Sequence, residues 1–458
     1  MKTAHKADRQ DCMSDKRRIA IPDAVGLILL GISFYLVFDS TRYIYASLVV
    51  FLAGLMSLSL ERRSHHSASI GALARHIYTI APTAVILTLV AAALSGFGSN
   101  FTRADFGMFY ASGLQLRTDP AHLYDVEVQN QVLASVTGNL EYHYLSFPYP
   151  PFVAALFVPL SYVRFRDAYY IMLAANVILL ATAIYILSRS LFAKKHQVLT
   201  IVLAASVLLP VYINIILGQL AFVGLLLYSL FVVDVLDKRT TRAGLWIAFL
   251  SFKLALVPIP LCVLLVKRAW KGLGLAVAVF ASLMGLSLLL VGPGGMWANF
   301  DVMATMADKS LIPRMQSLRA LAYYLGLPDW IYLLVTATIV GALWFVDRRG
   351  GEPHWMLGAA VLANLAVSPY VQSYDLSLAL VAIALAIATF PEMPDSKRTA
   401  VLLMVFVPGF LGVAGLVTGK DWPVVPVTVL LLFCWFLYRA AVNRQKSMPL
   451  CAESPLKS

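Results

Sequence analysis

The chain has 458 residues, of which 60% are hydrophobic and 13% charged, and its formal net charge is +12. A mean hydropathy of +0.78 excludes an ordinary soluble domain. Apolar runs of about twenty residues recur along the chain and predict a polytopic α-helical membrane protein. The positive charge does not indicate a nucleic-acid partner, because Lys and Arg gather in short loops between the apolar runs, as the positive-inside rule describes.

In chain order, the candidate membrane spans number about 12, each with uncertain boundaries. They cover roughly residues 22–38, 42–60, 77–97, 167–190, 197–217, 219–236, 270–291, 329–346, 355–371, 374–390, 399–418 and 423–440. We therefore expect one membrane domain over residues 21–440, between cytoplasmic tails at 1–20 and 441–458. The basic clusters then fall inside, and two long polar loops, 99–150 and 292–328, fall outside.

Two segments do not fit a simple pattern in which successive spans alternate between the inside and the outside. Residues 150–163 form an apolar stretch too short to span, which we expect as an embedded or surface helix. Residues 243–266 have basic clusters at both ends, so this stretch is expected either to enter the membrane and return or to cross it in an irregular way. Pro258 and Pro260 favour a break in it, because proline removes a backbone donor. A broken helix at membrane depth is tolerated where it lines a polar cavity.

Asp105 follows directly after an apolar run, which puts a carboxylate at the expected lipid–water boundary. Two interpretations are open for it. The pair Thr102 and Asp105 has the spacing of a helix cap, and residues 104–118 carry an apolar stripe typical of a surface helix. The alternative is a chemical role at the outer face.

Other polar residues also have more than one possible role. Lys253 lies within an apolar stretch, where lysine is a phosphate ligand, a snorkelling side chain or half of an ion pair. Gln219 follows Gly218 in a very tight turn, Arg319 is a ligand or an interfacial anchor, and Asp375 is a ligand or a helix cap. In the expected topology, Asp105, Gln219, Arg319 and Asp375 all face the outside.

An ordered series of short motifs resembles glycosyltransferase family 87, once called domain of unknown function 2029, over about residues 80–390. The motifs are Asp105-Phe106 with Phe109-Tyr110, Asp119-Pro120, Leu123-Tyr124-Asp125, Tyr149-Pro150-Pro151, Gly218-Gln219, Phe252-Lys253, Trp297 to Phe300, Gln316-Ser317, Ser368-Pro369-Tyr370 and Tyr374-Asp375. Two positions depart from the family pattern. Leu254 stands where many relatives have proline, and Tyr374-Asp375 stands where many have histidine, so no role of that histidine is carried over.

The resemblance implies an all-α GT-C fold with about 12 membrane helices plus re-entrant or juxtamembrane helices. It implies an inverting enzyme of a bacterial plasma membrane that moves a mannose-like hexose from a polyprenyl-phosphate donor to a hydroxyl of a glycolipid or glycan. By this resemblance Asp105 is the catalytic aspartate. We predict no metal or cofactor, and we predict the further site residues as donor ligands (Lys253, Gln219, Gln316, Arg319, Tyr374 and Asp375) and as residues that shape the loop (Tyr110, Tyr149, Pro150 and Pro151).

Two other classes of function compete with a transferase. A secondary transporter or a lipid-linked-sugar flippase would explain the break within 243–266, but such proteins often carry an inverted repeat, and we detect none. A non-catalytic membrane scaffold would leave the Asp105 loop without a purpose.

Overall fold

The structure is a computed structural model, and it describes residues 105–137, 147–305, 312, 315–389 and 424–447. All of them belong to the second of two compact units, Ala92–Ser458. Several expected features lie outside the described residues. These are the N-terminal tail, the spans at 22–38, 42–60, 77–97 and 399–418, Thr102, and the part of the C-terminal tail beyond residue 447.

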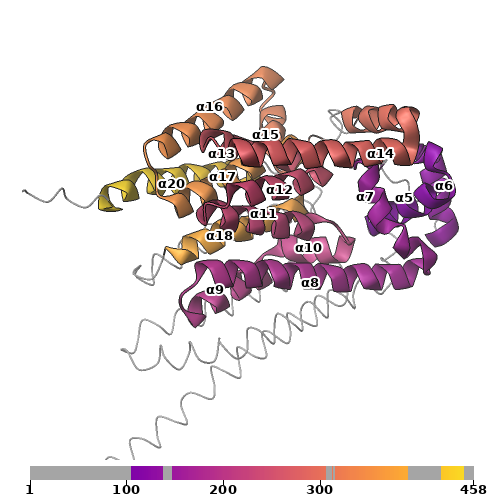
Figure 1. The fold of residues 1–458 in the computed structure, drawn as a ribbon, viewed down its shortest axis with the longest axis horizontal. Coiled ribbons are helices and arrows are strands. Elements are labelled where there is room, and N and C mark those ends of the chain that lie inside the picture. The colour runs from indigo at the N-terminus through magenta and orange to yellow at the C-terminus, as the bar shows by residue number, and fades with distance from the viewer. Residues whose placement is uncertain (1–104, 138–146, 306–311, 313–314, 390–423, 448–458) are drawn as a thin grey trace, which may run out of the picture. The chain divides into compact units, whose positions relative to one another are not determined.

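The described residues form helices and contain no β-strand (Figure 1). In chain order these helices are α5 (Phe106–Thr118), η3 (Pro120–His122), α6 (Val126–Thr137), α7 (Pro151–Phe157), η4 (Pro159–Tyr162), α8 (Phe165–Leu191), α9 (Lys195–Val207), α10 (Leu209–Leu217), α11 (Ala221–Leu236), α12 (Thr240–Leu250), η5 (Ser251–Leu256), α13 (Pro258–Val266), α14 (Trp270–Thr305), α15 (Leu318–Tyr324), α16 (Asp329–Arg348), α17 (Pro353–Val367), η7 (Ser373–Leu378), α18 (Ala379–Ala388) and α20 (Val424–Ser447).

Four helical segments among the described residues are long and apolar enough to cross a membrane: Phe165–Leu191, Trp270–Thr305, Asp329–Arg348 and Val425–Asn443. The chain is therefore a helical membrane protein, as expected, while the total of about 12 spans stays a prediction. The expected span 197–217 is divided into α9 and α10 at Leu208, with Pro210 in the first turn of α10. Helix α20 continues to Ser447, and the cytoplasmic tail expected from residue 441 stays a prediction.

The expected start of the second outer loop, residue 292, coincides with a break within a helix. Helix α14 extends beyond residue 292, with a break at Gly292, where φ is +69° and ψ is 178°. Glycine reaches this backbone conformation without strain, and Pro293 can begin a new helical turn because its missing N–H has no partner there. The chain turns back at this break and stays helical to Thr305 (Figure 1).

Residues 243–266 break and fold back on themselves, as a segment that enters the membrane and returns would do. Helix α12 leads into the 3₁₀ turn η5, in which Lys253 has the non-helical angles φ −130° and ψ 89°, and α13 starts at Pro258. A Cβ on Gly272, near the start of α14, would lie 2.3 Å from the Thr240 carbonyl oxygen and 3.3 Å from Leu264 Cδ1. The start of α12 and the end of α13 are therefore at the same end, and we call α12–η5–α13 the re-entrant hairpin.

The turn of the re-entrant hairpin packs against α11. The Tyr228 hydroxyl donates to the Leu256 carbonyl oxygen at 3.2 Å, and a Cβ on Gly224 would contact Leu256 Cδ1 at 3.2 Å. Gly224 lies only five residues after Gln219. The turn therefore reaches the level at which α11 begins, far from the basic ends of its two arms.

Helix α5 is not the surface helix that its pattern suggests. Most of its residues are buried, and it contacts α6, α7 and α8. A Cβ on Gly113 would lie 2.5 Å from the Phe157 carbonyl carbon, so α5 and α7 touch through their backbones. The rings of Phe109 and Phe157 stack at 4.9 Å between centroids. Protein side chains therefore cover the stripe that was expected to face lipid, and α7 takes the embedded alternative.

We expect Gly244→Ala to destabilise the re-entrant hairpin, because the new Cβ would lie 2.0 Å from the Gly272 carbonyl oxygen. Overpacking of this kind costs about 1–3 kcal/mol. Gly274→Ala is the matched control, since nothing described lies within 4 Å of its Cβ position. Thermal unfolding in detergent should show a lower midpoint for Gly244→Ala only. Equal midpoints would contradict the close approach of α12 and α14.

Candidate active site

Asp105 meets Gln219 through a close approach of two turns. Gly218 ends α10 in the left-handed conformation, with φ +64°, and a Cβ there would lie 2.7 Å from Phe106 Cβ. Only glycine meets both requirements without strain. The contact brings Asp105 beside the next residue, and Gln219 Nε2 donates to Asp105 Oδ2 at 2.6 Å.

The Asp105 side chain does not act as the helix cap that its spacing suggests. Although Asp105 occupies the N-cap position of α5, its carboxylate makes no capping hydrogen bond within the described chain. Burial raises the pKa of the Asp105 carboxyl above its usual range, and the hydrogen bond from Gln219 partly opposes this shift. The carboxylate is thus more basic than one in water, and it is held in one orientation.

Tyr149 lies next to this pair and is fixed from several sides. Its hydroxyl is 3.5 Å from Gln219 Oε1, and its carbonyl oxygen accepts from Tyr124 (2.7 Å) and Asn299 (3.2 Å). Its ring is nearly parallel to the ring of Phe252, with 6.5 Å between centroids. Tyr149 therefore joins the first outer loop to the re-entrant hairpin.

Lys253, in the turn of the re-entrant hairpin, forms a buried ion pair with Asp375. Lys253 Nζ lies 2.5 Å from Asp375 Oδ2, and the two side chains are 8% and 1% exposed. The Gln372 backbone N–H donates to the same oxygen at 2.8 Å, so Asp375 also caps η7, as one interpretation predicted. Asp375 Oδ1 is buried and has no hydrogen-bond partner among the described residues.

Aromatic rings surround the Lys253 ammonium group. Nζ lies 5.1 Å from the ring centroid of Tyr374 and 5.6 Å from that of Tyr370, both within cation–π range. Both rings therefore help to stabilise the buried positive charge.

The Asp105 pair and the Lys253 pair belong to one site. Burial, and then the nearby charges of Asp375 and Asp105, raise the pKa of Tyr149 well above its usual value. Tyr149 is thus within electrostatic reach of both carboxylates. The site combines one carboxylate held by a neutral amide, a second carboxylate held by an ammonium group, and aromatic walls between them.

The remaining predicted residues lie around this centre at different distances. The Gln316 backbone N–H donates to the Val371 carbonyl oxygen at 2.8 Å, beside the turn that carries Tyr370. Arg319 lies near Tyr332 of α16, and its role as a donor ligand stays a prediction. Tyr110 donates to the Val163 carbonyl oxygen at 2.8 Å, so it braces α5 against the chain after η4. Pro150 and Pro151 start α7 directly after Tyr149.

Sequence reasoning missed four residues of this site: Asn299, Phe252, Tyr370 and Gln372. The first three lie within motifs that carried the family resemblance, so position in a motif was an available signal. Gln372 gave no such signal, because it contributes a backbone N–H. Within the described ranges, no three His, Cys, Asp or Glu side chains are grouped as metal ligands would be.

Comparison with protein families identifies a family for this chain. No curated protein matches the chain. The sequence profile of glycosyltransferase family 87 matches residues 147–390, just over half of the chain. The match includes Tyr149, Gln219, Lys253 and Asp375, and it begins after the segment that carries Asp105. With this match and the helical membrane architecture, the chain belongs to glycosyltransferase family 87.

Proposed function

We propose that this glycosyltransferase is an inverting GT-C enzyme that moves a mannose-like hexose from a polyprenyl-phosphate donor to the hydroxyl of a glycolipid or glycan. The observation that carries the proposal is the arrangement around Tyr149. The Tyr149 hydroxyl lies 3.5 Å from the Gln219 amide that orients the Asp105 carboxylate, and its ring faces Phe252, the neighbour in sequence of the buried Lys253 ammonium group. Transfer of a sugar from a phosphate needs a carboxylate to accept the proton of the acceptor hydroxyl and a cation to bind the phosphate.

In the proposed reaction the acceptor oxygen attacks the anomeric carbon of the donor sugar, and Asp105 takes the proton of that hydroxyl. The bond between the anomeric carbon and the phosphate oxygen breaks, and polyprenyl phosphate leaves with the electron pair. General-base help of this kind contributes about 10²–10⁴-fold. The raised pKa of Asp105 suits it to this task, while Gln219 keeps the carboxylate aimed.

Lys253 is proposed to bind the donor phosphate by exchanging partners. Before the donor arrives, its ammonium group is neutralised by Asp375 at 2.5 Å. The donor phosphate is negatively charged, as Asp375 is, so it competes with Asp375 for Lys253 Nζ. Asp375 keeps its bond from the Gln372 N–H, and its buried Oδ1 is placed to accept a hydrogen bond from a sugar hydroxyl. Tyr370 and Tyr374 form aromatic walls at this position.

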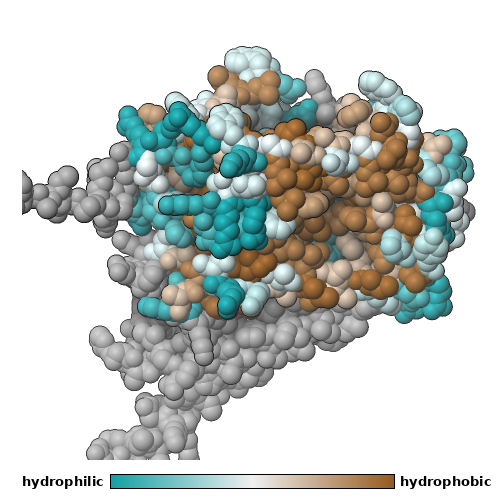
Figure 2. Space-filling model, viewed as in Figure 1, coloured by the Kyte–Doolittle hydropathy of each residue, from teal (hydrophilic) through white to brown (hydrophobic). Residues whose placement is uncertain are grey.

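The site is proposed to face the outside of the cell, with both termini in the cytoplasm of a bacterium. The basic residues Arg239, Arg242, Lys267 and Arg348 lie near the ends of the hairpin arms and of α16, away from Lys253. Figure 2 shows hydrophobic side chains over the middle of α14 and hydrophilic ones toward its beginning and over α6. Positive charge marks cytoplasmic ends.

A transporter or flippase is the competing proposal, and one observation favours it. The re-entrant hairpin places a buried charge at a helix break, as substrate sites of transporters do. The two proposals differ in what happens to the donor. A transporter leaves the bond between the sugar and the phosphate intact, so turnover of the donor by the wild-type protein in the first test below separates them.

Asp105→Asn should lower turnover of a polyprenyl-phosphate sugar by about 10²-fold or more, because an amide cannot accept the proton. Asparagine is nearly the same size as aspartate, and its amide oxygen can still accept the hydrogen bond from Gln219, so thermal stability in detergent should be kept. Asp119→Asn, an exposed carboxylate in the same loop that pairs with His122, is the control and should stay active. An Asp105→Asn protein that binds donor and turns over at the wild-type rate would end the proposal.

Gln219→Met should move the acid limb of the kcat/KM profile to higher pH. The reaction needs the Asp105 carboxylate, so the rate falls as pH drops through its pKa. The Gln219 hydrogen bond lowers that pKa, and its loss must raise it. Initial rates across the acid range measure the effect. An acid limb at the wild-type position would show that Asp105 is not the titrating base.

Lys253→Ala should weaken donor binding by about 2–5 kcal/mol, as commonly follows removal of one buried charged partner, and Lys253→Arg should weaken it less. The single change leaves Asp375 buried without its cation. The double variant Lys253→Met with Asp375→Asn removes that problem and should still bind donor weakly. Unchanged affinity in both variants, measured with a fluorescent donor analogue, would make the lysine a structural residue.

A further inference from the structure

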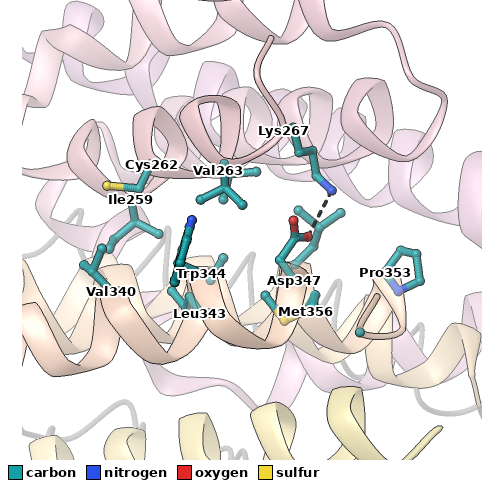
Figure 3. A pocket seen from close by; sticks show the side chains of 14 residues that line it. Ile259, Cys262, Val263, Lys267, Val340, Leu343, Trp344, Asp347, Pro353 and Met356 are labelled. Carbon is teal, nitrogen blue, oxygen red and sulfur yellow. Dashed lines mark hydrogen bonds and ion pairs between the residues drawn. The ribbon is translucent and has the colours of Figure 1, made fainter. Parts of the chain in front are cut away.

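A groove runs along α13, between α13, α16 and α17, from Ile259 near the hairpin turn to Lys267 at the open end of the re-entrant hairpin. Its empty volume is about 540 Å³, including the part that is open to the outside. Ile259 and Val263 of α13 face Val340 and Leu343 of α16 across it (Figure 3). Among the described residues that line this groove, Lys267 and Asp347 alone carry charge, and both lie at one end.

That charged end has more positive than negative charge. Lys267 Nζ lies 3.2 Å from Asp347 Oδ1, and their side chains are 31% and 23% exposed, so solvent and ligands reach the pair. Each partner also has exposed cations beside it in the sequence: Arg268 and Lys271 on one side, Arg348 and Arg349 on the other.

The nearest other carboxylate does not reduce this surplus. Glu352 accepts from the Trp355 backbone N–H at 2.9 Å and from His354 at 2.8 Å, so it caps α17. The mouth of the groove therefore keeps positive charge that no described carboxylate neutralises.

We propose that this groove binds an anionic phospholipid, with an acyl chain along the apolar walls and the headgroup phosphate at Lys267. The apolar walls and the cationic mouth together match the two parts of such a lipid. On binding, the headgroup phosphate displaces Asp347 as the ionic partner of Lys267. The proposal does not rest on the proposed transfer reaction.

The groove is distinct from the site around Lys253. The nine residues of α13 lie between Lys253 and Lys267 in the sequence, and as a helix they span about 13 Å. One phosphate cannot contact both lysines. Because α13 is the arm that carries the Lys253 turn, a lipid seated against it would brace the re-entrant hairpin from its open end.

Phosphatidylglycerol is the probe, added to the full chain purified in an uncharged detergent. It should raise the thermal midpoint and slow maleimide labelling of Cys262, which lines the groove. The exposed Cys434 of α20 is the internal control, and its labelling should not change. Phosphatidylcholine with the same acyl chains and free glycerol phosphate should have little effect. Equal protection by phosphatidylcholine would mean a nonspecific lipid coat and would overturn the proposal.

Two variants with opposite expected signs sharpen the test. Lys267→Gln should weaken phosphatidylglycerol binding about fivefold, the usual effect of one basic residue near anionic lipid. Asp347→Asn should strengthen binding, because it removes the competitor for Lys267. Arg189→Gln, an exposed cation in the last turn of α8, should leave binding unchanged. If both pair variants lower stability without changing the lipid dependence, the pair is only a structural bridge between α13 and α16.

Discussion

A buried ammonium group is costly in an apolar environment unless a carboxylate lies against it, and the Lys253–Asp375 pair meets this constraint. The pair joins residues 122 positions apart. It fixes the turn of the re-entrant hairpin to η7, and the backbone opens at Lys253 to direct the side chain there. Removing either partner would leave an uncompensated charge, so the re-entrant hairpin and η7 depend on each other.

The two carboxylates of the site differ in what holds them, and this difference sets their roles. Asp105 is held by the neutral amide of Gln219, and burial raises its pKa. Asp375 is held by a cation and by the Gln372 N–H. Environment commonly assigns different tasks to neighbouring carboxyl groups. In the proposed reaction Asp105 is the proton acceptor, and Asp375 is the counter-ion of Lys253.

The re-entrant hairpin has a lysine–carboxylate pair at each end. The pair at its turn is buried, and the Lys267–Asp347 pair at its open end is partly exposed. Between them, α12 and α14 approach through Gly244 and Gly272, which leaves little freedom to slide. A ligand that competes for either lysine therefore acts on the same rigid element.

The sequence by itself determined the membrane class, the break and return of 243–266, the tight turn at Gly218 and the family resemblance, because hydropathy, prolines and glycines act locally. It did not determine that α5 is buried, that α14 continues past Gly292, or that Lys253 pairs with Asp375 and Gln219 with Asp105. An apolar stripe has the same pattern whether lipid or protein covers it. Partners more than a hundred residues apart are chosen by packing, and Gly218 shows how. The sequence predicts its turn, but only the tertiary structure shows that its missing Cβ admits Phe106.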